Sequence, residues 1–143
     1  GGVDSTLRRT KATVAANAKL IIHERILTEH SQQANTEFEV ELNGDGAGVD
    51  LISRSVAKDN SHQAYRSRIV GNARCSGHSE CDAIIAGNGT VSAAPELDAN
   101  NEGAALIHEA AIGKIAGEQL LKLKTLGLTE EEAEAKIVAG FLK

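Results

Sequence analysis

The chain of 143 residues contains no methionine, no tryptophan and a single proline, Pro95. Only three residues are aromatic, namely Phe38, Tyr65 and Phe141. Proteins that bind nucleic acids normally present a basic face or aromatic side chains on which bases stack. With a net charge of −5, a pI near 5.5 and so few rings, the chain lacks both features. The composition therefore argues against nucleic acid as a partner.

Long apolar runs and a set of cysteines are also missing. No apolar run approaches the roughly 18 residues that a membrane-spanning helix needs, and no signal-peptide pattern is present. Two cysteines are too few for a disulfide scaffold, which favours an intracellular, thiol-maintaining compartment. We therefore expect a cytoplasmic protein without membrane insertion. The Gly-Gly start and the lack of methionine favour a piece of a longer protein, truncated at its N-terminal end.

Alternation of apolar and charged residues predicts β-strands in most of the chain. Residues 36–42 alternate throughout, with Phe38, Val40 and Leu42 on one face. Further short strands are predicted at 21–27, 49–56, 65–70, 83–86 and 104–107, separated in many places by polar turns. Such strands fit a sandwich, a barrel or a solenoid. Small inward side chains and scarce rings favour the thin core of a solenoid.

The C-terminal residues show a helical pattern instead. Apolar residues recur at helical spacing over 114–126 and 130–141. Gly127 stands where the first helix would end with a positive φ, and Thr129 with Glu132 has the spacing of a capping box. Two such short helices cannot bury all their apolar side chains against each other. Some of these side chains are therefore expected to pack on the solenoid or on a partner.

One polar stretch, residues 72–82, holds both cysteines, Cys75 and Cys81, with His78 midway between them. Thiolate and imidazole are ligands that zinc and soft transition metals prefer, so these three residues are candidate metal ligands. A second polar pair, His108-Glu109, lies within an apolar run, and a carboxylate suits ferrous iron. We expect the two stretches to meet in space and to handle iron and sulfur.

Simpler interpretations of the same residues stay open. Free cysteines are often small buried hydrophobic residues, which applies to both cysteines here. His78 stands among glycine and serine, which is typical of a solvated loop, and His108 fits a hydrogen-bonded core histidine. A buried, unpaired Glu109 would be costly, so Lys114 is the expected partner of its carboxylate.

Five motifs follow one another in the order of a known family. They are Cys-Asp-Ala-Ile-Ile at 81–85, His-Glu-Ala-Ala-Ile-Gly-Lys-Ile at 108–115, Glu-Gln-Leu at 118–120, Gly-Leu-Thr-Glu-Glu-Glu-Ala at 127–133 and Ile-Val-Ala-Gly-Phe at 137–141. In this order they resemble the C-terminal part of the SufB/SufD family, core components of SUF iron–sulfur cluster assembly. The resemblance implies a right-handed parallel β-helix, here residues 1–112, followed by a C-terminal helical domain, residues 113–143.

The resemblance also implies sites and partners. Cys81 and Glu109 match positions that serve the assembly of a transient iron–sulfur cluster in the SufB branch, and His108 belongs to the same motif. Family members pair through their β-helices, so the partner would be a SufB/SufD paralogue or a second copy. They bind the ABC-type ATPase SufC through the helical domain, here the helices between Lys114 and Phe141, and a sulfur-donor protein is implied. SufB-type, SufD-type and ancestral forms stay open, because Cys75 and His78 do not map onto the scaffold branch.

Three functions follow from these residues. The first is a non-enzymatic scaffold, in which Cys81 and Glu109 share a patch that faces a partner. One chain supplies too few thiolates for a stable four-cysteine cluster, so this site would be labile and shared at a dimer interface. The second is a SufD-like adaptor without its own cluster site. The third is a zinc-dependent enzyme that uses Cys75, His78 and Cys81. We rank the scaffold first.

Overall fold

The structure, a computed structural model, describes residues 2–143 and consists of eight strands followed by two helices. The strands are β1 (Ser5–Val14), β2 (Lys19–Thr28), β3 (Gln33–Leu42), β4 (Gly48–Ala57), β5 (His62–Gly71), β6 (Cys75–Ile85), β7 (Thr90–Ala99) and β8 (Ala104–Lys114). The odd-numbered strands form one parallel sheet, sheet A, in the order β1-β3-β5-β7. The even-numbered strands form sheet B, in the order β2-β4-β6-β8.

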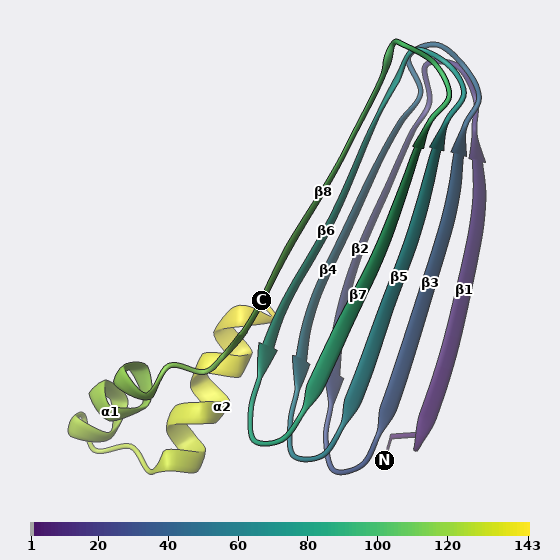
Figure 1. Cartoon of the computed structure of the whole chain (residues 1–143). Helices are drawn as coiled ribbons and strands as arrows, with labels where there is room; N and C mark the ends of the chain where they lie inside the picture. Colours follow the sequence, from purple (N-terminus) through teal and green to yellow (C-terminus); the bar gives the residue numbers. More distant parts are fainter. Residues whose placement is uncertain (1) are drawn as a thin grey trace.

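Because the chain alternates between the two sheets, each pair of consecutive strands makes one turn of a β-solenoid. Figure 1 shows the two sheets face to face, with their strands running in opposite directions. Four such turns are stacked, and β7 and β8 are the edge strands at one end. The predicted mainly-β solenoid fold is therefore confirmed.

The turns between strands repeat their backbone conformation from one solenoid turn to the next. After β2, β4 and β6 a residue with positive φ reverses the chain, namely His30 (55°), Asp59 (56°) and Gly87 (69°). At another corner, the Asn72 side-chain amide donates to the Asn43 amide oxygen at 2.7 Å. Glycine, asparagine and aspartate tolerate or stabilise such turns, which explains their spacing in the sequence.

The core lies between the two sheets and is made by every second residue of each strand. Phe38, Val40 and Leu42 are buried, so the inward face predicted for residues 36–42 is confirmed. Fully buried partners come from other strands, among them Leu51 and Ile69. Residues at the same register stack on each other from turn to turn, which gives the thin, branched core that the composition predicts.

The inner faces also carry polar side chains. The Glu24 carboxylate is buried, accepts a hydrogen bond of 2.7 Å from the Ser53 hydroxyl and pairs with the Arg8 guanidinium. Burial is the main cause that raises the pKa of Glu24 above its ordinary value. The Tyr65 and Ser79 hydroxyl oxygens lie 2.8 Å apart. Each of these groups has a partner, as buried polar groups require.

Three strands differ from the sequence-based expectation. β1 and β7 were not predicted, and β6 begins at Cys75, where the sequence indicated a loop around His78. β7 contains Pro95, which lacks the backbone donor of a sheet ladder. An edge strand tolerates this loss, and β7 is the edge of sheet A.

The two helices are α1 (Gly117–Thr125) and α2 (Glu130–Phe141). The first helix begins later than predicted, because β8 continues to Lys114, past the expected domain boundary at residue 112. Gly127 has φ 94°, as predicted. The capping box is also confirmed, since the Glu132 backbone amide donates to Thr129 Oγ1 at 3.2 Å and the Thr129 amide donates to Glu132 Oε2 at 2.9 Å.

The helices lie beside the lower end of sheet B in Figure 1. α2 is held by its buried Ala133 and Val138 and by an ion pair of 3.6 Å between Glu134 and Lys58, in the turn after β4. α1 has no buried residue; Leu121 in its middle is 63% exposed, and Leu126 at its C-cap is 77% exposed. Neither helix of residues 2–143 is long and apolar enough to cross a membrane.

Candidate metal and sulfur site

Strands β6 and β8 bring together the two polar stretches that the sequence singled out. They pair in parallel, with Glu80 opposite Glu109 and Cys81 opposite Ala110. The predicted meeting of these stretches is therefore confirmed. β8 is the edge strand of sheet B, so the site lies at one end of the solenoid.

The pleat of β6 separates the cysteines from the histidine. Cys75 and Cys81 point into the core, where they are 7% and 1% exposed, while His78 lies on the outer face. Successive residues of a strand point to opposite faces, so an odd spacing puts His78 on the face opposite both cysteines. The structure does not bring these three side chains together, and the predicted loop conformation of His78 is wrong. Both cysteines are free, as expected.

The Cys81 thiol is a buried core group. Burial is the main cause that raises its pKa from 9.0 to about 11, and the negative charges of Asp82 and Glu24 add to the effect. His78 lies on the other side of the sheet and is not among the groups that shift the pKa of Cys81. At neutral pH Cys81 is therefore a thiol, whereas the reactive form is the thiolate.

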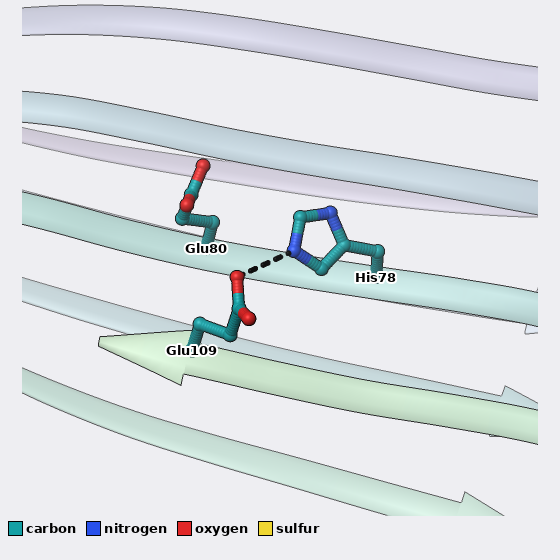
Figure 2. A group of neighbouring side chains, drawn as sticks. All are labelled: His78, Glu80 and Glu109. Atoms are coloured by element: carbon teal, nitrogen blue, oxygen red, sulfur yellow. Dashed lines mark hydrogen bonds and ion pairs between the residues drawn. The ribbon is translucent and has the colours of Figure 1, made fainter.

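His78 forms the centre of a polar cluster on the outer face of sheet B. Its Nδ1 lies 2.7 Å from Asp50 Oδ1 in β4, and its Nε2 lies 3.3 Å from Glu109 Oε2 in β8. The hydrogen bond to Asp50 is the main cause that raises the pKa of His78, and the bond to Glu109 acts in the same direction. Figure 2 shows the imidazole and the Glu109 carboxylate facing each other.

Glu109 is not buried, contrary to the sequence-based interpretation. Its side chain is 62% exposed, so no burial cost has to be offset, and its partner is His78 rather than Lys114. Glu80 stands beside it on β6 in Figure 2. One ligand atom from each of His78, Glu80 and Glu109 lies within 4.8 Å of the others, so the three could hold a metal ion.

Two members of the cluster, Glu80 and Asp50, were missed from the sequence. The alternation of His78, Ser79 and Glu80 predicts Glu80 on the face of His78 once residues 75–85 are recognised as a strand. Asp50 joins from β4 only through the sheet register, where it is opposite His78. No local pattern in the sequence predicts that Asp50 lies beside His78.

His108 points inward from β8, opposite Ser79. Both of its ring nitrogens are buried and have no hydrogen-bond partner within residues 2–143. The interpretation of His108 as a hydrogen-bonded core histidine is therefore wrong. Burial is the main cause that lowers the pKa of His108, with the nearby His78 acting in the same direction. A neutral imidazole with a free nitrogen is available as a ligand.

Cys81 and Glu109 do not share one face. The thiol lies on the inner face of sheet B and the carboxylate on its outer face, although their strands are adjacent. The prediction that Cys81 and Glu109 share one patch is therefore wrong, because they lie on opposite sides of the same pair of strands. The edge strand β8 carries His108 toward the inner side and Glu109 toward the outer side.

Comparison with known proteins agrees with the family that these motifs indicate. The family model for "SUF system FeS cluster assembly, SufBD core domain" matches residues 3–141. The chain belongs to the SufBD family. This SufBD chain is 40% identical over 103 residues, 71% of its length, to an iron–sulfur cluster assembly SufBD family protein of Methanothermobacter thermautotrophicus.

Two further archaeal relatives cover more of the SufBD chain. Proteins of the same description from Archaeoglobus fulgidus and Pyrococcus horikoshii are each 34% identical to it, over 92% and 100% of its length. The chain spans only 25%, 36% and 32% of the three relatives, in the order given. The family is therefore one of SUF iron–sulfur cluster assembly, and the chain corresponds to part of its longer members.

Proposed function

We propose that this SufBD chain forms part of a non-enzymatic scaffold subunit on which a transient iron–sulfur cluster is assembled as cargo. Cys81 receives sulfur and His108 supplies a ligand for iron on the inner side of the β6–β8 pair, while Glu109 supplies a ligand for iron on its outer side. The observation that carries this proposal is the β6–β8 register, which sets the strand of Cys81 beside the strand of His108 and Glu109.

The imidazole of His108 supports a ligand role. A buried polar atom without a hydrogen bond costs about 1–3 kcal/mol, and native structures keep few of them. Both ring nitrogens of His108 are of this kind. Bonding to iron, or to a group of a partner at the open end of the solenoid, would satisfy one of them.

Sulfur transfer to Cys81 requires its thiol to be uncovered and deprotonated. The thiolate attacks the outer sulfur of a persulfide on a sulfur-donor protein, the S–S bond of the donor breaks, and the donor cysteine leaves as a thiolate. Cys81 then carries the persulfide. Ala110, opposite Cys81 on β8, is already exposed, so displacement of this one edge strand would open the route.

Two surfaces support roles for partners. The edge strands β7 and β8 present backbone groups without a strand partner, which is a template for pairing with a SufB/SufD paralogue or a second copy. The exposed Leu121 and Leu126 at α1 are apolar groups that a SufC-type ATPase would cover. Both roles agree with assembly in a multi-subunit complex.

Anaerobic reconstitution of the full-length protein with ferrous iron and sulfide tests the scaffold role. Cys81→Ala and Glu109→Gln should lose most of the visible absorption of the cluster, with the fold retained by circular dichroism. Cys75→Ala is the matched control, because Cys75 is also buried on the inner face of β6. Equal cluster content in the Cys81 and Cys75 variants would refute the role of Cys81.

The burial of Cys81 favours a second candidate, an adaptor that recruits the ATPase without a cluster site of its own. In that case both cysteine variants reconstitute alike, while Leu121→Asp with Leu126→Asp abolishes binding to the ATPase. Ile21→Asp is the matched control, since it places the same charge on an exposed apolar position of β2, outside the helices. The reconstitution separates the two candidates, and pull-down with the purified ATPase tests the docking surface that both of them need.

A further inference from the structure

We propose that His78, Glu80 and Glu109 form a binding site for one first-row divalent cation on the outer face of sheet B. The site is complete within one chain and needs no cysteine. The biological role of this cation site rests on the proposed function. In that role, the site holds ferrous iron before sulfide arrives. Binding of the cation itself depends only on the residues described.

The sheet register sets the spacing of the three ligands. Glu80 and Glu109 are direct neighbours across β6 and β8, and His78 lies two residues before Glu80 on the same face. One ligand atom from each lies within 4.8 Å of the others, and His78 Nε2 is 3.3 Å from Glu109 Oε2. Bonds of about 2.0–2.2 Å to one cation place neighbouring ligand atoms about 3.0–3.6 Å apart. The His78–Glu109 pair already has this spacing, and side-chain rotation of the half-buried Glu80 and the exposed Glu109 would close the remaining separations.

The charges of the two glutamates also favour a bound cation. Glu80 and Glu109 are like charges directly opposite each other on one face of a sheet, an arrangement that is destabilising without a counterion. The ion pairs of the cluster all involve His78, which contacts Asp50 and Glu109, and within residues 2–143 Glu80 has none. A divalent cation between the two carboxylates removes this repulsion.

Asp50 orients the imidazole for coordination. With the Nδ1 proton donated to Asp50 at 2.7 Å, Nε2 faces Glu109 (Figure 2), and a cation that displaces the Nε2 proton would bind to the lone pair left there. Metal-binding histidines commonly have such a carboxylate on the other ring nitrogen, which sets the tautomer and the ring orientation. Asp50 is thus a positioning residue, not a ligand.

The donor set selects the class of ion. One imidazole nitrogen and two carboxylate oxygens suit Fe²⁺, Mn²⁺ or Zn²⁺, whereas soft Cu⁺ prefers thiolates. Ca²⁺ takes six to eight oxygen ligands, more than this cluster offers. Three protein ligands leave coordination positions open to water, and later to sulfide.

Titration of the full chain with Co²⁺ and Zn²⁺, and with Fe²⁺ under anaerobic conditions, tests the proposal by calorimetry and absorption. We expect one ion per chain, a Co²⁺ spectrum without the intense near-ultraviolet band of thiolate ligation, and at least tenfold weaker binding in Glu80→Gln and Glu109→Gln. Asp50→Asn should weaken binding roughly tenfold or more, as outer-shell partners do.

Asp82→Asn is the matched control, because Asp82 is the next outward carboxylate of β6 and lies opposite Arg54. Its affinity should equal that of the wild type. Wild-type affinity in the Glu80 and Glu109 variants, or a thiolate band that disappears in Cys81→Ser, would overturn the site. If the cation binds as described but Cys81→Ala still assembles clusters, the scaffold role fails and the cation site stands.

Discussion

The accessibility of the Cys81 thiol gives the most demanding test of the β6–β8 arrangement. Burial raises the pKa of Cys81 from 9.0 to about 11. At pH 8 this lowers the thiolate population about a hundredfold, which corresponds to about 2.7 kcal/mol. Iodoacetamide reacts with the thiolate, so Cys81 in the native chain should be alkylated at least about a hundred times more slowly than in urea, as followed by mass spectrometry.

The same assay examines the proposed route through the edge strand. Leu106 on β8 packs against the core, and Leu106→Ala should cost about 2 kcal/mol, toward the low end for a partly buried leucine. If the displacement of β8 uncovers Cys81, this change speeds native alkylation by up to about thirtyfold. Val14→Ala is the matched control, because Val14 is buried in β1 at the opposite end of the solenoid.

Two results would refute the reasoning. Alkylation of native Cys81 at the rate of the unfolded chain would show that the thiol does not lie on the inner face. Equal acceleration by Leu106→Ala and Val14→Ala would show that Cys81 is reached by unfolding of the whole solenoid and not by displacement of β8.

Three further predictions concern the stability of the folded chain. Gly89→Ala should lower the free energy of unfolding in urea by about 1–3 kcal/mol, because the new Cβ would lie 2.4 Å from the Ala57 carbonyl oxygen. Gly113→Ala is the control and should change this free energy little, because a Cβ there has no atom within 4 Å. Because burial raises the pKa of Glu24, the stability that this group contributes is full below its unfolded pKa and is lost as the pH rises through its folded pKa. The Tm of Glu24→Gln minus the Tm of the wild type should therefore increase from pH 4 to 7. A Tm difference that stays constant over this range would contradict the prediction. Thr129→Ala should cost about 1 kcal/mol and speed amide exchange in α2 but not in the sheets.

Some features could be predicted because neighbouring residues in the sequence create them. Alternation over 36–42 needs only the period of a strand, and the capping box needs only Thr129 and Glu132, which are three positions apart in the sequence. The scarcity of aromatic residues also indicated a thin core. The motif order from Cys81 to Phe141 indicated the family, which the family model confirms.

The loop predicted around His78 was wrong for a physical reason. Glycine and serine have low β-propensity, so residues 75–79 resemble a turn. In the structure, however, a Cβ on Gly77 would lie 2.9 Å from Leu106 Cδ2 and 3.0 Å from Ile69 Cγ2. The close packing of the neighbouring strand and the opposite sheet therefore favours glycine there, and propensity along the chain cannot show this.

By itself, the sequence determined the alternation of strand 36–42 and the helical ending, because these depend on period and local hydrogen bonds, and its composition favoured a solenoid over a sandwich or a barrel. Only the tertiary structure decided that Cys81 faces the core while His78 and Glu109 face outward, and that Asp50 and Glu80 join them. Side-chain direction in a strand changes with every residue, so the faces follow from register alone. Register is set by the stacking of whole solenoid turns, between residues far apart in the chain.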